Sequence, residues 1–202
     1  VRLLRMETKV QPLVRSKTIA KVASIVANAV LAQTGWRGDE SSCELELLRG
    51  SCVEEFTQFD DHVRTRDGVH TVRSASYLNW RYLHPAAPLH QILTARRQGV
   101  LVGYVVYASA GDEGQIVDLN SLDEPSIIAR LLAGAVQNLS ASGISAVNLY
   151  AGDVHPWGII LQRAGFRKRE NSPIVAGSRL EGTVSSLGFQ NKWYVMSGER
   201  DC

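Results

Sequence analysis

The stretch from residue 116 to residue 166 constrains the fold more than any other part of the chain, because strand-like and helix-like patterns alternate along it. Residues 116–119 form a short apolar run that predicts a strand. Apolar residues then recur at steps of one, three and four through 127–139, as they do on one face of a helix. A second apolar run at 146–150 and a second helical pattern at 157–164 follow. This order predicts a β-α-β crossover followed by another helix.

The rest of the chain predicts further strands and helices of the same sheet. They are a strand at 44–48, helices at 53–66 and 75–83, strands at 89–97 and 100–109, and a last strand at 192–196. Ser74 can cap the second of these helices, and Gln98-Gly99 is a two-residue hairpin signal. Three antiparallel strands before a β-α-β crossover predict a mixed α/β (α+β) sheet with helices on both faces.

The first 40 residues predict a separate N-terminal helical extension, and residues 41–202 predict the main domain. The apolar face of the predicted helix consists of Ile19, Val22, Val26 and Val30. Burying each of these side chains is worth about 1.5–3 kcal/mol, so we expect the helix to pack on the main domain or on a second copy in a homodimer. The chain begins with Val1 rather than Met, so it could be a piece of a longer protein with a second, related domain, or Val1 could reflect the choice of start codon.

The charge balance and the cysteines narrow the classes of function. The chain has 22 Lys and Arg residues, 20 Asp and Glu residues and a formal net charge of +2, so we expect no nucleic-acid partner. The most apolar stretch, 18–34, contains Lys21 and Asn28 and is too short and too polar to span a membrane. Three cysteines without CxxC spacing predict neither a disulfide framework nor a metal site, and they fit a reducing, cytoplasmic location.

The region from residue 44 to residue 202 resembles the GNAT superfamily of N-acetyltransferases. In that family a helix with a Leu-Leu pair follows the central strand, and a glycine, a strand and a helix ending in Gly-Phe come next. The corresponding residues are Leu131-Leu132, Gly143, 145–150 and Gly165-Phe166. Residues 77–82 and 193–195 are similar to a divergent bacterial GNAT-like group. The resemblance implies a GNAT-like acyl-CoA acyltransferase fold.

The resemblance also implies a reaction, in which an acyl group moves from a thioester, acetyl-CoA or another acyl-CoA, to an amine of a small molecule or an amino sugar. The family cradles the pyrophosphate of coenzyme A with a Q-x-x-G-x-G motif at the start of a helix. Counting back from the Leu-Leu pair puts Asp123, Ser126 and Ile128 at these positions, so the motif is absent. The implied contacts with the acyl donor are Leu119, Asn120, Ser121 and Ser126.

Two residues are candidates for proton transfer. Asp118 interrupts an apolar strand near the place where acceptor amines bind in the family, so it could act as a general base or simply point outward. His155 stands near the position of a family Asn, and it could carry a proton near neutral pH or only cap a helix. Leu161 replaces the Tyr that serves many family members as a general acid.

A second interpretation follows from the same departures. Without the phosphate cradle and the Tyr, the chain could be a catalytically degenerate GNAT-like module that binds a ligand or a partner domain. Trp80 and Arg81 are expected to pack in the core and to anchor the second predicted helix, rather than to contact a ligand.

Overall fold

The computed structural model describes residues 1–4, 43–64, 69–85, 89–151, 157–169, 193–194 and 196 of the 202 residues. At β3 (Val69–His70) the first side chain, and at β8 (Trp193–Tyr194) both side chains, lie outside this description. The predicted N-terminal helix and His155 also lie outside the described residues.

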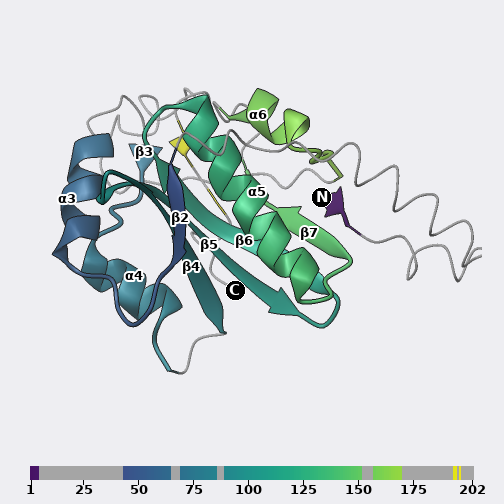
Figure 1. Cartoon of the computed structure of the whole chain (residues 1–202), viewed down its shortest axis with the longest axis horizontal. Coiled ribbons are helices and arrows are strands. Elements are labelled where there is room, and N and C mark those ends of the chain that lie inside the picture. Colours follow the sequence, from purple (N-terminus) through teal and green to yellow (C-terminus); the bar gives the residue numbers. More distant parts are fainter. Residues whose placement is uncertain are drawn as a thin grey trace, which may run out of the picture.

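A six-stranded mixed sheet forms the centre of the molecule (Figure 1). Its strands are β1 (Arg2–Leu3), β2 (Glu44–Leu47), β4 (His90–Arg97), β5 (Val100–Ala110), β6 (Glu113–Ser121) and β7 (Ala146–Leu149). They lie in the order β1-β7-β6-β5-β4-β2, and within this sheet only β6 and β7 run parallel. The described β3 and β8 form a separate parallel pair. The predicted mixed α/β sheet is confirmed.

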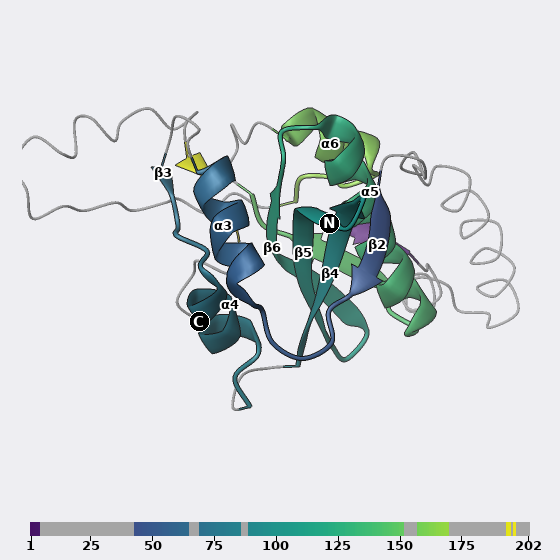
Figure 2. The ribbon, with the colours of Figure 1, turned by 60° about the vertical axis from the view of Figure 1, so that its left-hand side comes forward.

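Helices cover both faces of the sheet, as Figure 2 shows from the side. The helix α5 (Pro125–Ala141) lies on one face and is followed by the short α6 (Gly158–Arg163), whereas α3 (Glu54–Val63) and α4 (Ala75–Tyr82) lie on the other. The predicted apolar stripe of α5 packs against β4, β5 and β6, and its first residue is a proline, which suits an open helix start. Gly143, at φ 87°, ends this helix as predicted.

Two local predictions depend on turn chemistry, and both are confirmed. Gln98 and Gly99 have φ of 53° and 79°, and they join β4 to β5 in a hairpin that needs positive φ at both positions. The Ser74 hydroxyl accepts a hydrogen bond of 3.2 Å from the Tyr77 N–H and caps α4.

One prediction about α4 is wrong. Trp80 was expected in the core, but 64% of its surface is exposed. The buried side of α4 consists of Ala75, Leu78 and Tyr82, at steps of three and four, and Trp80 falls between the last two on the opposite side. The Trp80 ring instead lies 6.0 Å from the ring of Tyr77.

The first four residues belong to the sheet. Arg2 and Leu3 pair antiparallel with Val147 and Ala146, and the N-terminal ammonium donates a 2.8 Å hydrogen bond to the Arg167 carbonyl. Within the 1–40 segment that the sequence predicted as an extension, these residues therefore continue the main domain. In the part of the chain that the structure describes, every helix is too short or too polar to cross a bilayer.

Candidate active site

The parallel strands β6 and β7 pair over only part of their length. The pairing runs from Glu113 with Ala146 to Ile116 with Leu149, whereas β6 continues to Ser121. The described residues of β7 therefore give no partner to 117–120. A bulge lies at the same point, because Val106 pairs with Asp118 and Tyr107 pairs with Ile116. Bulges are frequent next to active sites, since they redirect a side chain and end regular pairing.

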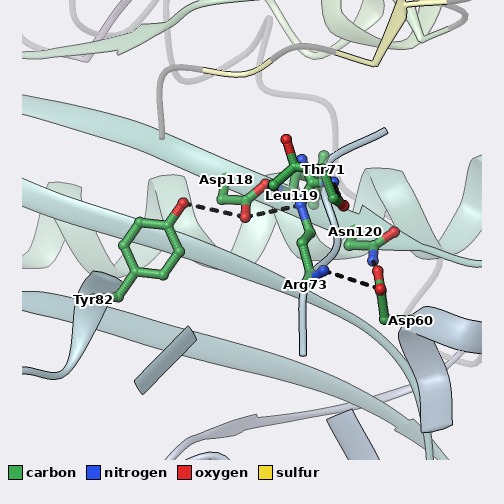
Figure 3. Close-up of polar contacts among 7 residues, drawn as sticks. All are labelled: Asp60, Thr71, Arg73, Tyr82, Asp118, Leu119 and Asn120. Carbon is green, nitrogen blue, oxygen red and sulfur yellow. Dashed lines mark hydrogen bonds and ion pairs between the residues drawn. The ribbon is translucent and has the colours of Figure 1, made fainter. Parts of the chain in front are cut away.

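The carboxylate of Asp118 follows this bulge and is buried, with 1% of the residue exposed (Figure 3). The Arg73 Nε lies 3.0 Å from both of its oxygens, and the Tyr82 hydroxyl donates to Oδ2 at 3.2 Å. The Leu119 N–H donates to Oδ1 at 2.9 Å. Asp118 points inward, toward α3 and α4, and three donors surround it.

Arg73 connects this carboxylate to a second one on α3. Its backbone N–H donates to Asp60 Oδ2 at 3.0 Å, and its Nη1 donates to the Thr71 carbonyl at 3.1 Å. The Asn120 amide donates to Asp60 Oδ1 at 3.4 Å, which is long for such a bond. We call Asp60, Arg73, Tyr82, Asp118 and Asn120 the polar network. It joins β6, α3, α4 and the segment before α4.

Burial changes the acidity of two groups in the polar network. Burial raises the pKa of Asp60, although the Arg73 N–H and the Arg73 and Arg64 charges act in the opposite direction. Burial, and then the charge of Asp118, raise the pKa of the Tyr82 hydroxyl well above its usual range. Tyr82 is therefore a stable hydrogen-bond donor to Asp118 at any ordinary pH, and Asp60 holds its proton more readily than an exposed aspartate.

Tyr104 lies beside the polar network on β5, where it pairs with Asn120. It is fully buried, and its ring packs against Phe56 and Phe59 with centroids 5.6 Å and 6.3 Å away. Burial, and then the charge of Asp118, raise the pKa of its hydroxyl, whereas the Arg73 charge and the Asn120 side chain act in the opposite direction. No described residue, Asn120 included, makes a hydrogen bond of acceptable geometry with this hydroxyl.

The structure places the predicted site residues in different surroundings. Asp118, Leu119 and Asn120 lie together in or beside the polar network. The Ser121 hydroxyl donates to the Leu122 carbonyl at 2.6 Å, and Ser126 is half-buried in the first turn of α5. Their contacts with an acyl donor, and the roles of Asp118 and His155 in proton transfer, stay predictions.

The start of α5 has no phosphate cradle. The Glu124 carboxylate is held by the Arg97 guanidinium through bonds of 2.6 and 3.2 Å. The Leu122 N–H donates to the Val102 carbonyl at 3.0 Å, and the Ile128 side chain is buried in the core. These residues do not fit the pyrophosphate of coenzyme A, because a cradle needs free N–H groups and close backbone approach.

Sequence reasoning missed Asp60, Arg73 and Tyr82. Asp60 had a signal, because it follows Phe56 by four residues and Phe59 by one, which puts a carboxylate on the buried stripe of α3. Arg73 had none, since it lies in a short irregular segment whose course only the fold determines. Within the described ranges, no group of three or more His, Cys, Asp or Glu residues is arranged to hold a metal ion.

No protein-family model matches the sequence, and no curated protein is significantly similar to it. The fold is similar to that of a ribosomal-protein-alanine N-acetyltransferase from Brucella melitensis biovar Abortus 2308, with a TM-score of 0.51 and 17% identity over 67% of this chain and 99% of that chain. It is also similar to a transcriptional regulator from Bacillus halodurans C-125, with a TM-score of 0.50 and 12% identity over 66% of this chain and 100% of that one.

These similarities establish the fold. The described sheet and helices form a GNAT fold, as the sequence resemblance predicted. Because an acetyltransferase and a transcriptional regulator share the architecture, function has to be argued from the residues of the site.

Proposed function

We propose that the chain is a GNAT-like acyltransferase that moves an acyl group from a thioester to the amine of a small molecule or an amino sugar. The position of the polar network carries the proposal: two buried carboxylates and a buried guanidinium lie where β6 runs beyond β7. Apolar side chains in place of buried ions are often neutral or stabilising, so a fold has no need of such groups. Buried ionisable groups beside a strand bulge are therefore candidates for function.

In this proposal the thioester lies along the end of β6, and a backbone N–H of 119–121 polarises its carbonyl group. Asp118 accepts from Arg73, Tyr82 and the Leu119 N–H, so the geometry favours it as the group that holds Arg73 and Tyr82 in place. His155, beyond the described residues, is the proposed proton donor to the leaving thiolate.

The acyl donor in this proposal does not rely on a pyrophosphate site at α5. The Arg97–Glu124 pair lies at the N-terminus of α5, and the Glu124 carboxylate would repel a phosphate group there. Acetyl-CoA or another acyl-CoA would then bind mainly through its thioester arm. The extended pantetheine part of an acyl-CoA can add to a strand edge through backbone hydrogen bonds. An acyl donor that lacks the nucleotide would therefore also be a substrate.

A transfer assay tests this function. We would incubate the full chain with glucosamine or propylamine and either acetyl-CoA or S-acetylpantetheine, and follow amide formation by mass spectrometry. The proposal predicts amide from both donors, with S-acetylpantetheine at least comparable to acetyl-CoA. Absence of amide with both donors and both amines, at millimolar concentrations, would overturn the acyltransferase assignment.

One observation favours a second candidate, a degenerate GNAT-like module that binds a ligand or a partner domain. The groups at the start of α5 already have partners within the chain, as they would if donor binding had been lost. For this module we expect a higher melting temperature with the thioester but no amide. A ligand at 100 times its Kd adds about 2.7 kcal/mol to the free energy of unfolding, which a melting curve detects.

Cys43 and Cys52 are buried and form no disulfide among the described residues, which fits the cytoplasm that we propose as the location. We also propose that the apolar helix of the N-terminal segment packs against this domain, a second GNAT-like domain or a second copy of the chain. Size-exclusion chromatography of the full chain, compared with a chain lacking residues 1–34, tests the assembly.

A further inference from the structure

Asp60 lacks a close cationic partner. Asp118 has the Arg73 guanidinium at 3.0 Å, but Asp60 receives only the neutral backbone N–H of Arg73 and the long bond from the Asn120 amide. Among the described residues, its ion pair is with Arg64, whose Nε lies 4.0 Å away on a partly exposed side chain. The buried part of the polar network thus holds two carboxyl groups and one guanidinium, and it has an excess of one negative charge whenever Asp60 is ionised.

The hydroxyl of Tyr104 supplies an independent observation at the same place. It is fully buried, and Asp118, Arg73, Asp60 and Asn120 lie near enough to affect its pKa. No described residue makes a hydrogen bond of acceptable geometry with it. Most buried hydroxyl groups have a partner, and an exception in a native fold calls for a ligand, a water molecule or a functional role. A group that donates hydrogen bonds would satisfy both this oxygen and the excess charge.

We propose that Asp60, Tyr104 and Asn120 bind the protonated amino group of the acyl acceptor, and that Asp60 is the base that takes its proton. An ammonium group has only donors, and these side chains offer a carboxylate, a hydroxyl oxygen and an amide oxygen as acceptors. The Asn120 amide nitrogen points to Asp60, so its carbonyl oxygen lies on the other side of the group (Figure 3). This inference rests on the proposed acyltransferase function.

The proton transfer balances with the reaction. Asp60 accepts one proton from the ammonium group, and the freed lone pair of the nitrogen attacks the thioester carbonyl. The C–N bond forms, the C–S bond breaks, and the second proton lost by the nitrogen goes to the leaving thiolate. The products are an amide and a thiol, and Asp60 releases its proton to solvent, so that thioester and ammonium give amide, thiol and one proton.

The environment of Asp60 suits this role better than that of Asp118. Burial raises the pKa of Asp60, which strengthens it as a base, whereas the oxygens of Asp118 are occupied by three donors. Asn120, with 9% of its surface exposed, is the most accessible member of the polar network and lies in the part of β6 that runs past β7. We therefore expect the amine to approach from this end of the strand.

Asp60→Asn is the sharpest variant, because it removes the charge and keeps the shape and an oxygen for the Arg73 N–H. Asp61→Asn is its matched control, since Asp61 is the next residue of α3 and its side chain is 58% exposed. Propylammonium chloride should raise the melting temperature of the wild type and of Asp61→Asn, but not that of Asp60→Asn. Tetramethylammonium, a cation without N–H donors, should have no effect on any of them.

In the transfer assay, Asp60→Asn should lower kcat/KM by about 10²–10⁴-fold and remove the acid limb of its pH profile. Asp61→Asn should keep kcat/KM and keep the acid limb, which should move to lower pH because the Asp61 charge helps to raise the pKa of Asp60. Equal kcat/KM and equal propylammonium shifts in Asp60→Asn and the wild type would overturn the inference while leaving the acyltransferase intact. If the wild type transfers no acyl group, the proposed function fails, and the propylammonium shift alone then decides whether this amine site exists.

Tyr104→Phe keeps the inference testable if Asp60→Asn does not fold. Loss of an unpartnered buried hydroxyl should not weaken the fold, yet the affinity for propylammonium should fall at least several-fold. A purely structural hydroxyl would leave that affinity unchanged, and such a result would contradict the proposal.

Discussion

The two faces of the sheet are built differently. Between α5 and the sheet, the core is mainly aliphatic and holds no buried ion pair among the described residues; it includes Ile127, Ile128, Leu131, Leu132 and Leu139. Between α3, α4 and the sheet, aromatic and aliphatic side chains surround Asp60, Arg73, Asp118 and Asn120, all of them buried. Alternation along β6 separates the two kinds of core, because Leu119 points to one face and Asp118 and Asn120 to the other.

This difference separates stability from function. An apolar face stabilises the fold in proportion to the area that it buries, and its exact residues can vary. A face with buried ions gains little net stability from them but depends on every partner being in place. We therefore expect substitutions on the α5 face to act on stability alone, and substitutions in the polar network to act on binding and pH dependence as well.

The largest loss should come from Arg73→Met, because it leaves the Asp118 carboxylate buried without its ion partner. Breaking such a pair typically costs about 3–5 kcal/mol, which chemical denaturation measures directly. Adding Asp118→Asn should recover most of the loss, since the buried charge is then gone. Arg97→Met removes an exposed pair with Glu124 and should change the unfolding midpoint very little. Equal losses of unfolding free energy for Arg73→Met and Arg97→Met would show that burial does not make the Arg73–Asp118 pair more sensitive than the exposed Arg97–Glu124 pair.

Leu132→Ala tests the apolar face and should cost about 2–5 kcal/mol, because it leaves a cavity in a fully buried core. The matched control is Ile159→Ala on α6, where 68% of the residue is exposed and the expected change is within about 0.5 kcal/mol. Neither variant should change the response to propylammonium once the protein is folded. If Leu132→Ala folded but its melting temperature no longer rose with propylammonium, the proposed difference between the two faces would be wrong.

Gly103→Ala should cost about 1–3 kcal/mol through crowding between β5 and β6. A Cβ at this position would lie 2.7 Å from the Ser121 Cβ and 3.1 Å from the Asn120 carbonyl oxygen, so the strands would have to shift next to the polar network. Gly158→Ala in α6 is the control, because a Cβ there meets nothing within 4 Å. An unchanged melting temperature of Gly103→Ala would show that β5 and β6 can move apart at Gly103 at little cost in free energy.

The smallest effect concerns pH. The folded pKa of Asp60 is raised, so its ionisation costs more in the folded than in the unfolded chain. This cost is complete above the folded pKa, and it disappears as the pH falls through that value to below the ordinary pKa of an aspartate. Asp60→Asn should therefore gain stability relative to the wild type at pH 7 and lose that gain at pH 4, as melting curves at both values would show. If the stability advantage of Asp60→Asn over the wild type instead grew as the pH fell, the pKa of Asp60 would be lowered by folding, which would contradict this prediction.

Much of the fold could be predicted from patterns that act locally. The stripe of α5, the Ser74 cap and the Gln98-Gly99 hairpin depend on residues close in sequence, and the structure confirms all three. The polar network could not be predicted as a whole, because Asp60, Arg73 and Asn120 meet only after α3, the segment before α4 and β6 have assembled. Asp118 was visible as a polar residue in an apolar strand, but the direction of its side chain required the bulge at Val117.

The polar network and the Tyr104 hydroxyl beside it serve binding rather than net stability, and the free energy of unfolding of Tyr104→Phe tests this most directly. The hydroxyl has no partner among the described residues, so we predict that its removal raises the free energy of unfolding by about 1 kcal/mol in urea titration. A clear decrease would show that the hydroxyl stabilises the fold, and it would contradict the separation of the two faces.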